Sequence, residues 1–290
     1  MNRRDLLSLP LTASLAAATA RAATKKPLGF QLYSVRTALS EKAPVTLKRL
    51  ADAGYRKVET LRPTHPQILP LCKDFGIAAV AGHYELAIAT GKPGPGLPAG
   101  YNWTQAADEA AKAGLKFMVI PYVAPPDRGN ADVYKRLADS LNKAGEITRK
   151  AGMTLAYHHH AFEFGPAAGG TERPIDILLA VPAENLTIEM DVFWVAIAGE
   201  DPVAMLKKWK GRVKLLHLKD RAPGAPKQFA ENLSPAAFRE VGYGNLDFKA
   251  ILKAAAETGV EHYFVEQDQV AGDPVEALTA SIRTLEKLGF

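Results

Sequence analysis

Three adjacent histidines end an apolar segment of the chain, in the stretch MTLAYHHHAFEF from Met153 to Phe164. The whole chain has only seven histidines. Successive side chains of a β-strand point to opposite faces, so we expect His158 and His160 to share one face and His159 to take the other. Two imidazoles on one face can serve as metal ligands or in proton transfer.

Ionisable or hydrogen-bonding side chains also end the other apolar segments. These residues are Gln31, Tyr33, Arg36, Glu59, His83, Tyr122, Asp191, His217, Lys219, Glu266 and Asp268. Random placement would scatter such residues over helix faces as well. The pattern therefore predicts that one end of each strand contributes to a shared polar site.

The imidazoles and carboxylates in this set have the chemistry of a divalent-metal site. His158, Asp191, His217 and Glu266 offer nitrogen and oxygen donors, which suit Mn²⁺, Zn²⁺, Co²⁺ or Fe²⁺ better than Ca²⁺. Their spacing along the chain is long and irregular, so the signal is weaker than a local motif such as HExxH. His217 alone could equally be a core histidine, and the choice between His158 and His160 as the ligand stays open.

Eight strand-like segments, each followed by a helical pattern, are expected to position these residues. The expected strands begin with residues 28–35, 55–60, 77–83 and 115–122, continue with the histidine stretch, and end with 186–191, 213–219 and 261–266. The expected helices cover 44–54, 65–76, 103–114, 131–152, 174–180, 202–209, 247–259 and 274–288. Glycines typical of left-handed helix stops follow five of these helical patterns, at Gly54, Gly76, Gly114, Gly152 and Gly259.

The strands are continuously apolar, which indicates a parallel sheet covered by helices. Eight such units predict a single-domain α/β fold, a (β/α)8 TIM barrel over residues 23–290. An open doubly wound sheet should carry a glycine-rich fingerprint after its first strand, and the segment FQLYSVR has none. Active sites of such barrels lie at the carboxyl ends of the strands, where the candidate residues stand.

The first 22 residues have the order of an export signal, with Arg3 and Arg4, a weakly apolar run, and an A-x-A site at residues 20–22. Paired arginines favour the Tat route, so we expect an exported, periplasmic protein. The apolar run is too short for a membrane span, which needs roughly 20 apolar residues. No membrane association is expected once the signal is cleaved.

The composition narrows the range of partners. The net charge of +5 comes partly from the signal, and no basic block follows it, so nucleic acid is not an expected partner. The single cysteine, Cys72, cannot form an internal disulfide. We expect it to be a small buried hydrophobic residue. The sequence is compatible with a homo-oligomer but contains no exposed apolar stripe that would prove one.

Six motifs together resemble the sugar phosphate isomerase/epimerase group of xylose isomerase-like TIM barrels. They are GFQLYSVR, YHHHAFEF, IEMDVFW, VKLLHLKDR, VGYGNLDF and YFVEQD, and they span essentially all of the chain beyond the signal. The resemblance implies one divalent metal, held by an acid from strand five, Asp from six, His from seven and Glu from eight. Asp191, His217 and Glu266 match this set, whereas His158 stands where the family has glutamate.

This departure bears on the expected chemistry. Epimerases of the group use the glutamates of strands five and eight as an acid/base pair beside the metal. Here one proton acceptor is expected to be Glu266, and the other to be His160, Glu163, Lys219 or a metal-bound water. Lys219 could instead pair with Asp191 or Asp220.

The first expectation is a metal-dependent isomerase or epimerase of a non-phosphorylated sugar or keto-sugar. The alternatives are a metal-dependent lyase, hydratase or hydrolase of a 3-keto-glycoside, and a non-catalytic sugar-binding barrel. Residues expected to contact the carbohydrate are Gln31, Tyr33, Glu59, His83, Tyr122 and Trp194. The stretch VGYGNLD could bind an anion at a helix N-terminus, although Asp247 argues for a simple N-cap.

Overall fold

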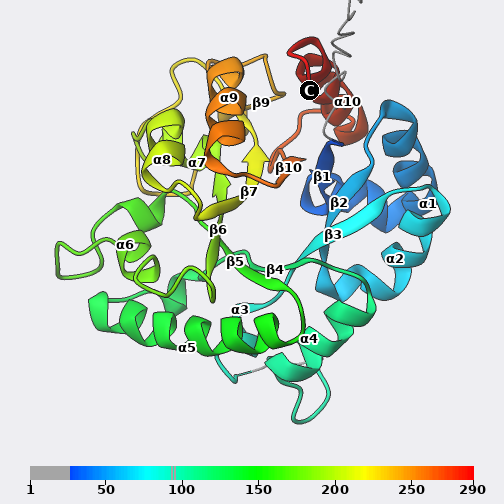
Figure 1. The fold of residues 1–290 in the computed structure, drawn as a ribbon. Coiled ribbons are helices and arrows are strands. Elements are labelled where there is room, and N and C mark those ends of the chain that lie inside the picture. Colours follow the sequence, from blue (N-terminus) through cyan, green and yellow to red (C-terminus); the bar gives the residue numbers. More distant parts are fainter. Residues whose placement is uncertain (1–26, 93, 95) are drawn as a thin grey trace, which may run out of the picture.

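The computed structural model describes residues 27–92, 94 and 96–290, so the predicted export signal at residues 1–22 lies outside the described residues. Within them, eight parallel strands close into a barrel surrounded by helices (Figure 1). The order around the barrel is β1-β10-β7-β6-β5-β4-β3-β2, and β1 closes the ring by pairing Gly29 with Phe264. The predicted single-domain TIM barrel is confirmed.

The barrel strands are short and lie within or close to the expected segments. They are β1 (Gly29–Gln31), β2 (Lys57–Leu61), β3 (Ala78–His83), β4 (Phe117–Ile120), β5 (Thr154–His158), β6 (Thr187–Asp191), β7 (Val213–Leu218) and β10 (His262–Val265). A separate antiparallel pair is formed by β8 (Asp220–Arg221) and β9 (Phe238–Arg239). The first strand ends earlier than expected because the Gln31 side chain accepts the N–H of Tyr33 and starts a 3-10 turn over Leu32–Val35.

Helices alternate with these strands. They are α1 (Arg36–Ala53), α2 (His65–Asp74), α3 (Leu86–Ala89), α4 (Trp103–Lys112), α5 (Ala131–Lys150), α6 (Pro174–Leu178), α7 (Val192–Ile197), α8 (Pro202–Lys208), α9 (Phe248–Thr258) and α10 (Pro274–Lys287). All five predicted glycine stops have positive φ, for example 115° at Gly54 and 94° at Gly259. Asp247 caps α9 by accepting the N–H of Ala250, as the N-cap interpretation predicts.

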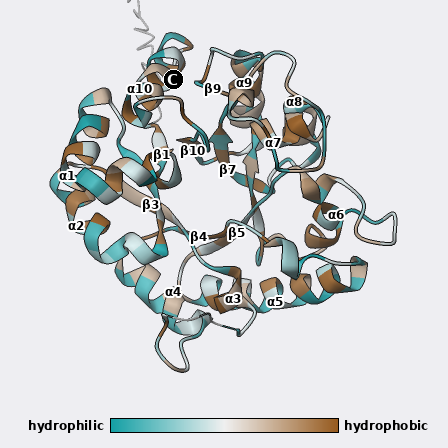
Figure 2. Cartoon of the chain, turned by 180° about the vertical axis from the view of Figure 1, so that it is seen from behind, coloured by the Kyte–Doolittle hydropathy of each residue, from teal (hydrophilic) through white to brown (hydrophobic). Residues whose placement is uncertain are grey.

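The main core lies between the barrel and its helices. In α5 the buried residues recur at helical spacing, and apolar and hydrophilic residues alternate along the surrounding helices (Figure 2). Cys72 is buried in this core, as expected, and burial raises the pKa of its thiol to about 12. Within the part of the chain that the structure describes, we find no helix with the length and apolar character that a membrane span requires.

Candidate active site

The interior of the barrel is apolar at one level and becomes polar two residues further along the strands. Val80, Ala81, Phe117, Val119, Ala156, Leu215 and Phe264 form an apolar cluster of their own. Two residues further along their strands, Ala81, Ala156, Leu215 and Phe264 are followed by His83, His158, His217 and Glu266. Because side chains repeat with period two along a strand, these polar groups stand on the same inward face, above the apolar cluster. The strand ends thus deliver imidazoles and carboxylates to one place.

The four predicted metal ligands lie together. One donor atom from each of His158, Asp191, His217 and Glu266 falls within 4.8 Å of the others, and all four side chains are buried. His217 Nδ1 is 3.0 Å from Glu266 Oε2 and 3.8 Å from Asp191 Oδ2. We call these four residues the upper group.

The upper group fits a divalent cation. Asp191 Oδ1 accepts the backbone N–H groups of Phe193 and Trp194 at the start of α7, at 2.8 and 3.1 Å, which leaves Oδ2 for another partner. Asp191 Oδ2 contacts Lys219 Nζ at 2.9 Å, and among the described residues His158 Nδ1 is buried without a hydrogen bond. Buried polar atoms are rarely left this way unless a ligand satisfies them. Imidazole and carboxylate donors suit Zn²⁺, Co²⁺, Fe²⁺ or Mn²⁺.

A buried lysine stands beside the upper group. Lys219 Nζ lies 2.9 Å from Asp191 Oδ2, 2.7 Å from Glu266 Oε2 and 2.8 Å from Asp268 Oδ1. Burial alone would lower the pKa of Lys219, but the attraction of the three carboxylates outweighs it and raises the pKa well above its usual value. Burial also raises the pKa of Glu266, but Lys219 and His217 hold it well below its ordinary range, so this carboxylate is ionised.

Lys219 does not pair with Asp220. The Asp220 carboxylate accepts backbone N–H groups from Gly242, Gly244 and Leu246 at 2.9 to 3.2 Å. A side chain of the protein therefore occupies the place where the glycine stretch could have received an anion.

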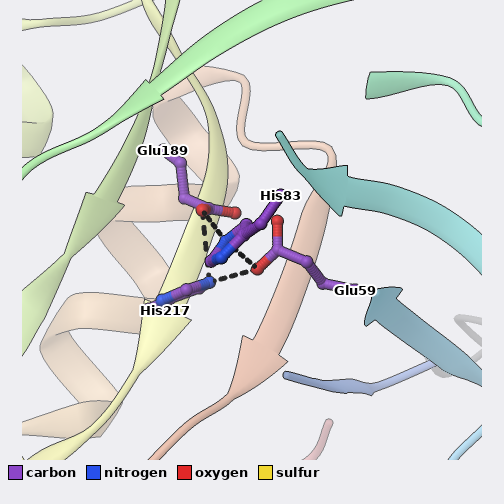
Figure 3. Close-up of side chains that lie close together, drawn as sticks. All are labelled: Glu59, His83, Glu189 and His217. Atoms are coloured by element: carbon purple, nitrogen blue, oxygen red, sulfur yellow. Dashed lines mark hydrogen bonds and ion pairs between the residues drawn. The ribbon is translucent and has the colours of Figure 1, made fainter. Parts of the chain in front are cut away.

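Four interior side chains lie close together and form a deeper group of Glu59, His83, Glu189 and His217, each from a different strand (Figure 3). His217 Nε2 is 2.6 Å from Glu59 Oε2, so opposite nitrogens of this ring face the two groups. Glu189 is a residue that the sequence analysis missed. The sequence feature that could have identified it is a glutamate inside the apolar segment LTIEMD. This residue stands two positions before Asp191 and hence on the same face of the strand.

A cavity of about 610 Å³ lies at the carboxyl ends of the strands. Its walls include Tyr33, His83, Tyr122, His158, His160, Trp194, Glu231, Phe238, Glu266 and Asp268. The ring of His160 stands 5.1 Å from that of Tyr122 and 5.2 Å from that of Trp194, between centroids. Burial lowers the pKa of His160 well below its usual value, so its ring is neutral.

The expected division of the three histidines is confirmed. His158 and His160 line the cavity, whereas His159 packs against Phe164 and Trp209, with ring centroids 5.1 and 5.9 Å away.

Two predicted carbohydrate contacts do not line the cavity. Gln31 and Glu59 are fully buried below it. The Gln31 amide lies 3.0 Å from His83 Nδ1, and Glu59 contacts His83 and His217. Both contact histidines of the site in this structure, and their predicted contact with a carbohydrate stays a prediction.

Glu163, a predicted candidate for proton transfer, lies outside the cavity lining, and its catalytic role stays a prediction. Its carboxylate accepts the Tyr157 hydroxyl at 2.7 Å and the backbone N–H of His160 at 2.8 Å, and it does not line the cavity. Burial raises the pKa of Glu163 to about 8. The turn after β5 directs this side chain behind the strand, where it holds the backbone of His160.

A loop residue far along the chain closes part of the cavity mouth. Glu231 Oε2 accepts Arg128 Nη2 at 2.6 Å and the Tyr122 hydroxyl at 3.2 Å. The Arg128 guanidinium also stands 3.4 Å from the centroid of the Phe162 ring. No sequence motif predicted the contact between Arg128 and Glu231, because these two residues lie in separate loops.

The closed parallel barrel and the imidazole–carboxylate cluster at its strand ends define a TIM barrel with a candidate divalent-metal site. The chain belongs to the xylose isomerase-like TIM barrel family, whose model matches residues 47–288.

Among curated relatives, the chain is similar to the inosose dehydratase of Clostridium botulinum (strain Alaska E43 / Type E3), with 35% identity over 158 residues. That match covers 51% of this chain and 52% of the relative, so the chain spans about half the length of this relative. The inosose dehydratase of Lacticaseibacillus casei is 26% identical over 266 residues, covering 80% of this chain and 86% of the relative.

Solved structures share the fold. A sugar phosphate isomerase/epimerase from Parabacteroides distasonis ATCC 8503 has a TM-score of 0.73 and 26% identity, covering 96% of this chain and 98% of its own. The IolI protein with a bound zinc atom has a TM-score of 0.67 and 18% identity, covering 91% and 98%.

The expectation of an isomerase or epimerase is wrong. The curated relatives with the similarities given above are dehydratases, which points to elimination chemistry and therefore to the lyase alternative. The inference rested on the group's name, whereas the histidine at the strand-five position was the observation that pointed away from a symmetric pair of glutamates.

Proposed function

We propose that this protein is a metal-dependent lyase that eliminates water, or a comparable oxygen substituent, from a polyhydroxylated ketone. The observation that carries the proposal is the upper group at the cavity floor, where an ionised Glu266 stands beside imidazoles and Lys219. Similarity to inosose dehydratases supports elimination over isomerisation.

His158, Asp191, His217 and Glu266 would hold the cation. When bound, a divalent cation acts as a Lewis acid that stabilises the negative charge developing on a carbonyl oxygen. The clustered, buried donor atoms of the upper group support this role.

Glu266 is the proposed catalytic base. It lines the cavity, and Lys219 and His217 keep it ionised against the effect of burial, which is the form that accepts a C–H proton next to a ketone. The C–H electrons then form a carbon–carbon double bond as the neighbouring C–O bond breaks. The proton on Glu266 returns to the leaving hydroxyl, water departs, and the carboxylate is restored.

Other side chains orient the substrate in this scheme. His160 has a buried Nδ1 without a hydrogen-bond partner among the described residues, and it faces the cavity between Tyr122 and Trp194. A neutral imidazole between two aromatic rings suits a sugar or cyclitol ring, which presents hydroxyls at its rim and C–H groups on its faces. Lys219 keeps Glu266 ionised and in place.

A product analysis tests this function. The protein is loaded with Zn²⁺, Co²⁺ or Mn²⁺ and incubated with inosose and, separately, with 3-keto-glucosides. The masses of the products are then measured by mass spectrometry. Elimination gives a product lighter by one water molecule, or by the alcohol of the glycoside. Chelator-treated protein is the control and should be inactive. A product of unchanged mass with altered stereochemistry would contradict the proposal.

We also propose that residues 1–22 direct export to the periplasm by the Tat route. The twin arginine, the weakly apolar run and the A-x-A site support this. Fractionation of cells that express the full chain tests it, with Arg3→Lys and Arg4→Lys together expected to retain the precursor in the cytoplasm. Equal export of both forms would contradict the Tat route.

A further inference from the structure

The deeper group has the arrangement of a second cation site. Four atoms form a closed N-O-N-O ring, shown by the dashed lines of Figure 3. Glu59 Oε2 is 2.6 Å from His217 Nε2 and 3.1 Å from His83 Nε2. Glu189 Oε2 is 3.3 Å from His217 Nε2 and 3.5 Å from His83 Nε2.

These separations can be compared with a metal's coordination sphere. A tetrahedral site with bonds of about 2.0–2.1 Å has ligand–ligand edges of about 3.3–3.4 Å. Three of the four measured edges lie within a few tenths of an ångström of that value, and the fourth, between His217 and Glu59, is shorter by less than 1 Å. The four N···O separations therefore lie near the edge lengths expected around a single ion.

Unsatisfied oxygens provide a second, independent observation. Glu189 is fully buried, and among the described residues its Oε1 has no hydrogen-bond partner, whereas its Oε2 faces imidazole nitrogens at 3.3 to 3.6 Å. Among the same residues, Glu59 Oε1 also has no hydrogen-bond partner. Leaving a buried carboxylate unsatisfied is costly, so such a group calls for a ligand or a cation. Figure 3 shows the Glu189 carboxylate directed toward the imidazoles rather than away from them.

Charge favours a divalent ion in this place. Two buried glutamates approach the same pair of imidazoles, and one divalent cation would neutralise both carboxylates in place of protons on the two rings. Neutral imidazoles are the form that binds metals.

We propose that Glu59, His83, Glu189 and His217 form a second divalent-cation site, one layer below the upper group. Two imidazole nitrogens and two carboxylate oxygens suit Zn²⁺ or Co²⁺. His217 takes part in both sites, with Nε2 facing the deeper ion and Nδ1 facing the upper group, so it would bridge two bound ions as an imidazolate. The proposal does not depend on the reaction catalysed in the cavity above.

Metal stoichiometry tests this site without an activity assay. The full-length protein is stripped with a chelator, reloaded with excess Zn²⁺, desalted, and analysed for zinc per chain by mass spectrometry. We expect two ions per chain for the wild type. Glu189→Gln should retain one, because the upper group is intact, and Asp191→Asn should also retain one. Glu261→Gln, which changes an exposed glutamate paired with Lys214, is the matched control and should retain two.

His83→Gln is a second variant of the deeper site, should Glu189→Gln fail to fold as judged by circular dichroism, and it should likewise retain one ion. A wild type with a single zinc that Glu189→Gln keeps and Asp191→Asn loses would overturn the deeper site and leave the proposed function standing. Two ions in both Glu189→Gln and His83→Gln would overturn it as well. Two ions in the wild type without elimination activity would support the deeper site and contradict the proposed function alone.

Discussion

Replacing Lys219 by methionine should expose how much the upper group depends on a single buried charge. The Lys219 ammonium lies within 2.9 Å of oxygens of three carboxylates, and its side chain is fully buried. Removing one partner of a buried ionic group typically costs about 3–5 kcal/mol. At about 2–4 °C per kcal/mol for a domain of this size, the melting temperature should fall by roughly 6–20 °C.

The assay is thermal unfolding in the presence of a chelator, followed by a second thermal unfolding experiment with Zn²⁺. Zinc should restore part of the loss, because an ion bound only by the folded state at a concentration 100-fold above its Kd adds about 2.7 kcal/mol. Lys214→Met, in the strand β7 that Lys219 directly follows, is the matched control. Lys214 and its partner Glu261 are 29% and 49% exposed, so its cost should stay below about 1 kcal/mol. A chelated Lys219→Met variant as stable as Lys214→Met would refute this account of the charges.

Three further predictions concern catalysis, packing and pH. Glu266→Gln should lower the rate of elimination by about 10²–10⁴-fold, which steady-state kinetics would measure, and an undiminished rate would remove Glu266 from the mechanism. Gly145→Ala should destabilise the fold by about 1–3 kcal/mol in chemical unfolding, because the new Cβ would lie 1.8 Å from the Asn185 carbonyl oxygen, whereas Gly170→Ala meets nothing closer than 4.0 Å and should be near neutral. Burial lowers the pKa of His65 to about 4, so the unfolded state binds more protons between that pH and about 6.5, and stability should rise with pH across this interval. His65→Gln should reduce that slope by up to about 1.4 kcal/mol per pH unit, and an unchanged slope would contradict the assignment.

The barrel could be predicted because its signals are local. Apolar runs, helical periodicity and glycines at helix ends are each read within a few residues, and Gly54 and Gly259 do adopt the left-handed conformation expected of helix stops. The boundaries that shifted depend on side-chain hydrogen bonds, as at Gln31, which ends β1 early. The helix α7, which was not predicted from the sequence, begins directly after Asp191, whose carboxylate caps it.

The candidate site could be predicted only in outline. Strand alternation separated His158 and His160 from His159, since that rule needs no knowledge of neighbouring strands. The deeper place of Glu59 and the backward turn of Glu163 depend on depth along the barrel axis and on loop geometry, which the sequence does not encode locally.

Glu189 shows the same limit. Its importance follows from convergence with residues of three other strands, and a single glutamate in an apolar segment did not reveal that convergence.

The central claim is that side chains from the ends of separate strands converge on a cation at the floor of the cavity. Crystals grown with zinc and measured at its absorption edge test this directly by anomalous scattering. The account predicts a peak within about 2.0–2.2 Å of donor atoms of Asp191, His217 and Glu266. An anomalous map with no peak among these side chains, although zinc is present in the crystal, would contradict it.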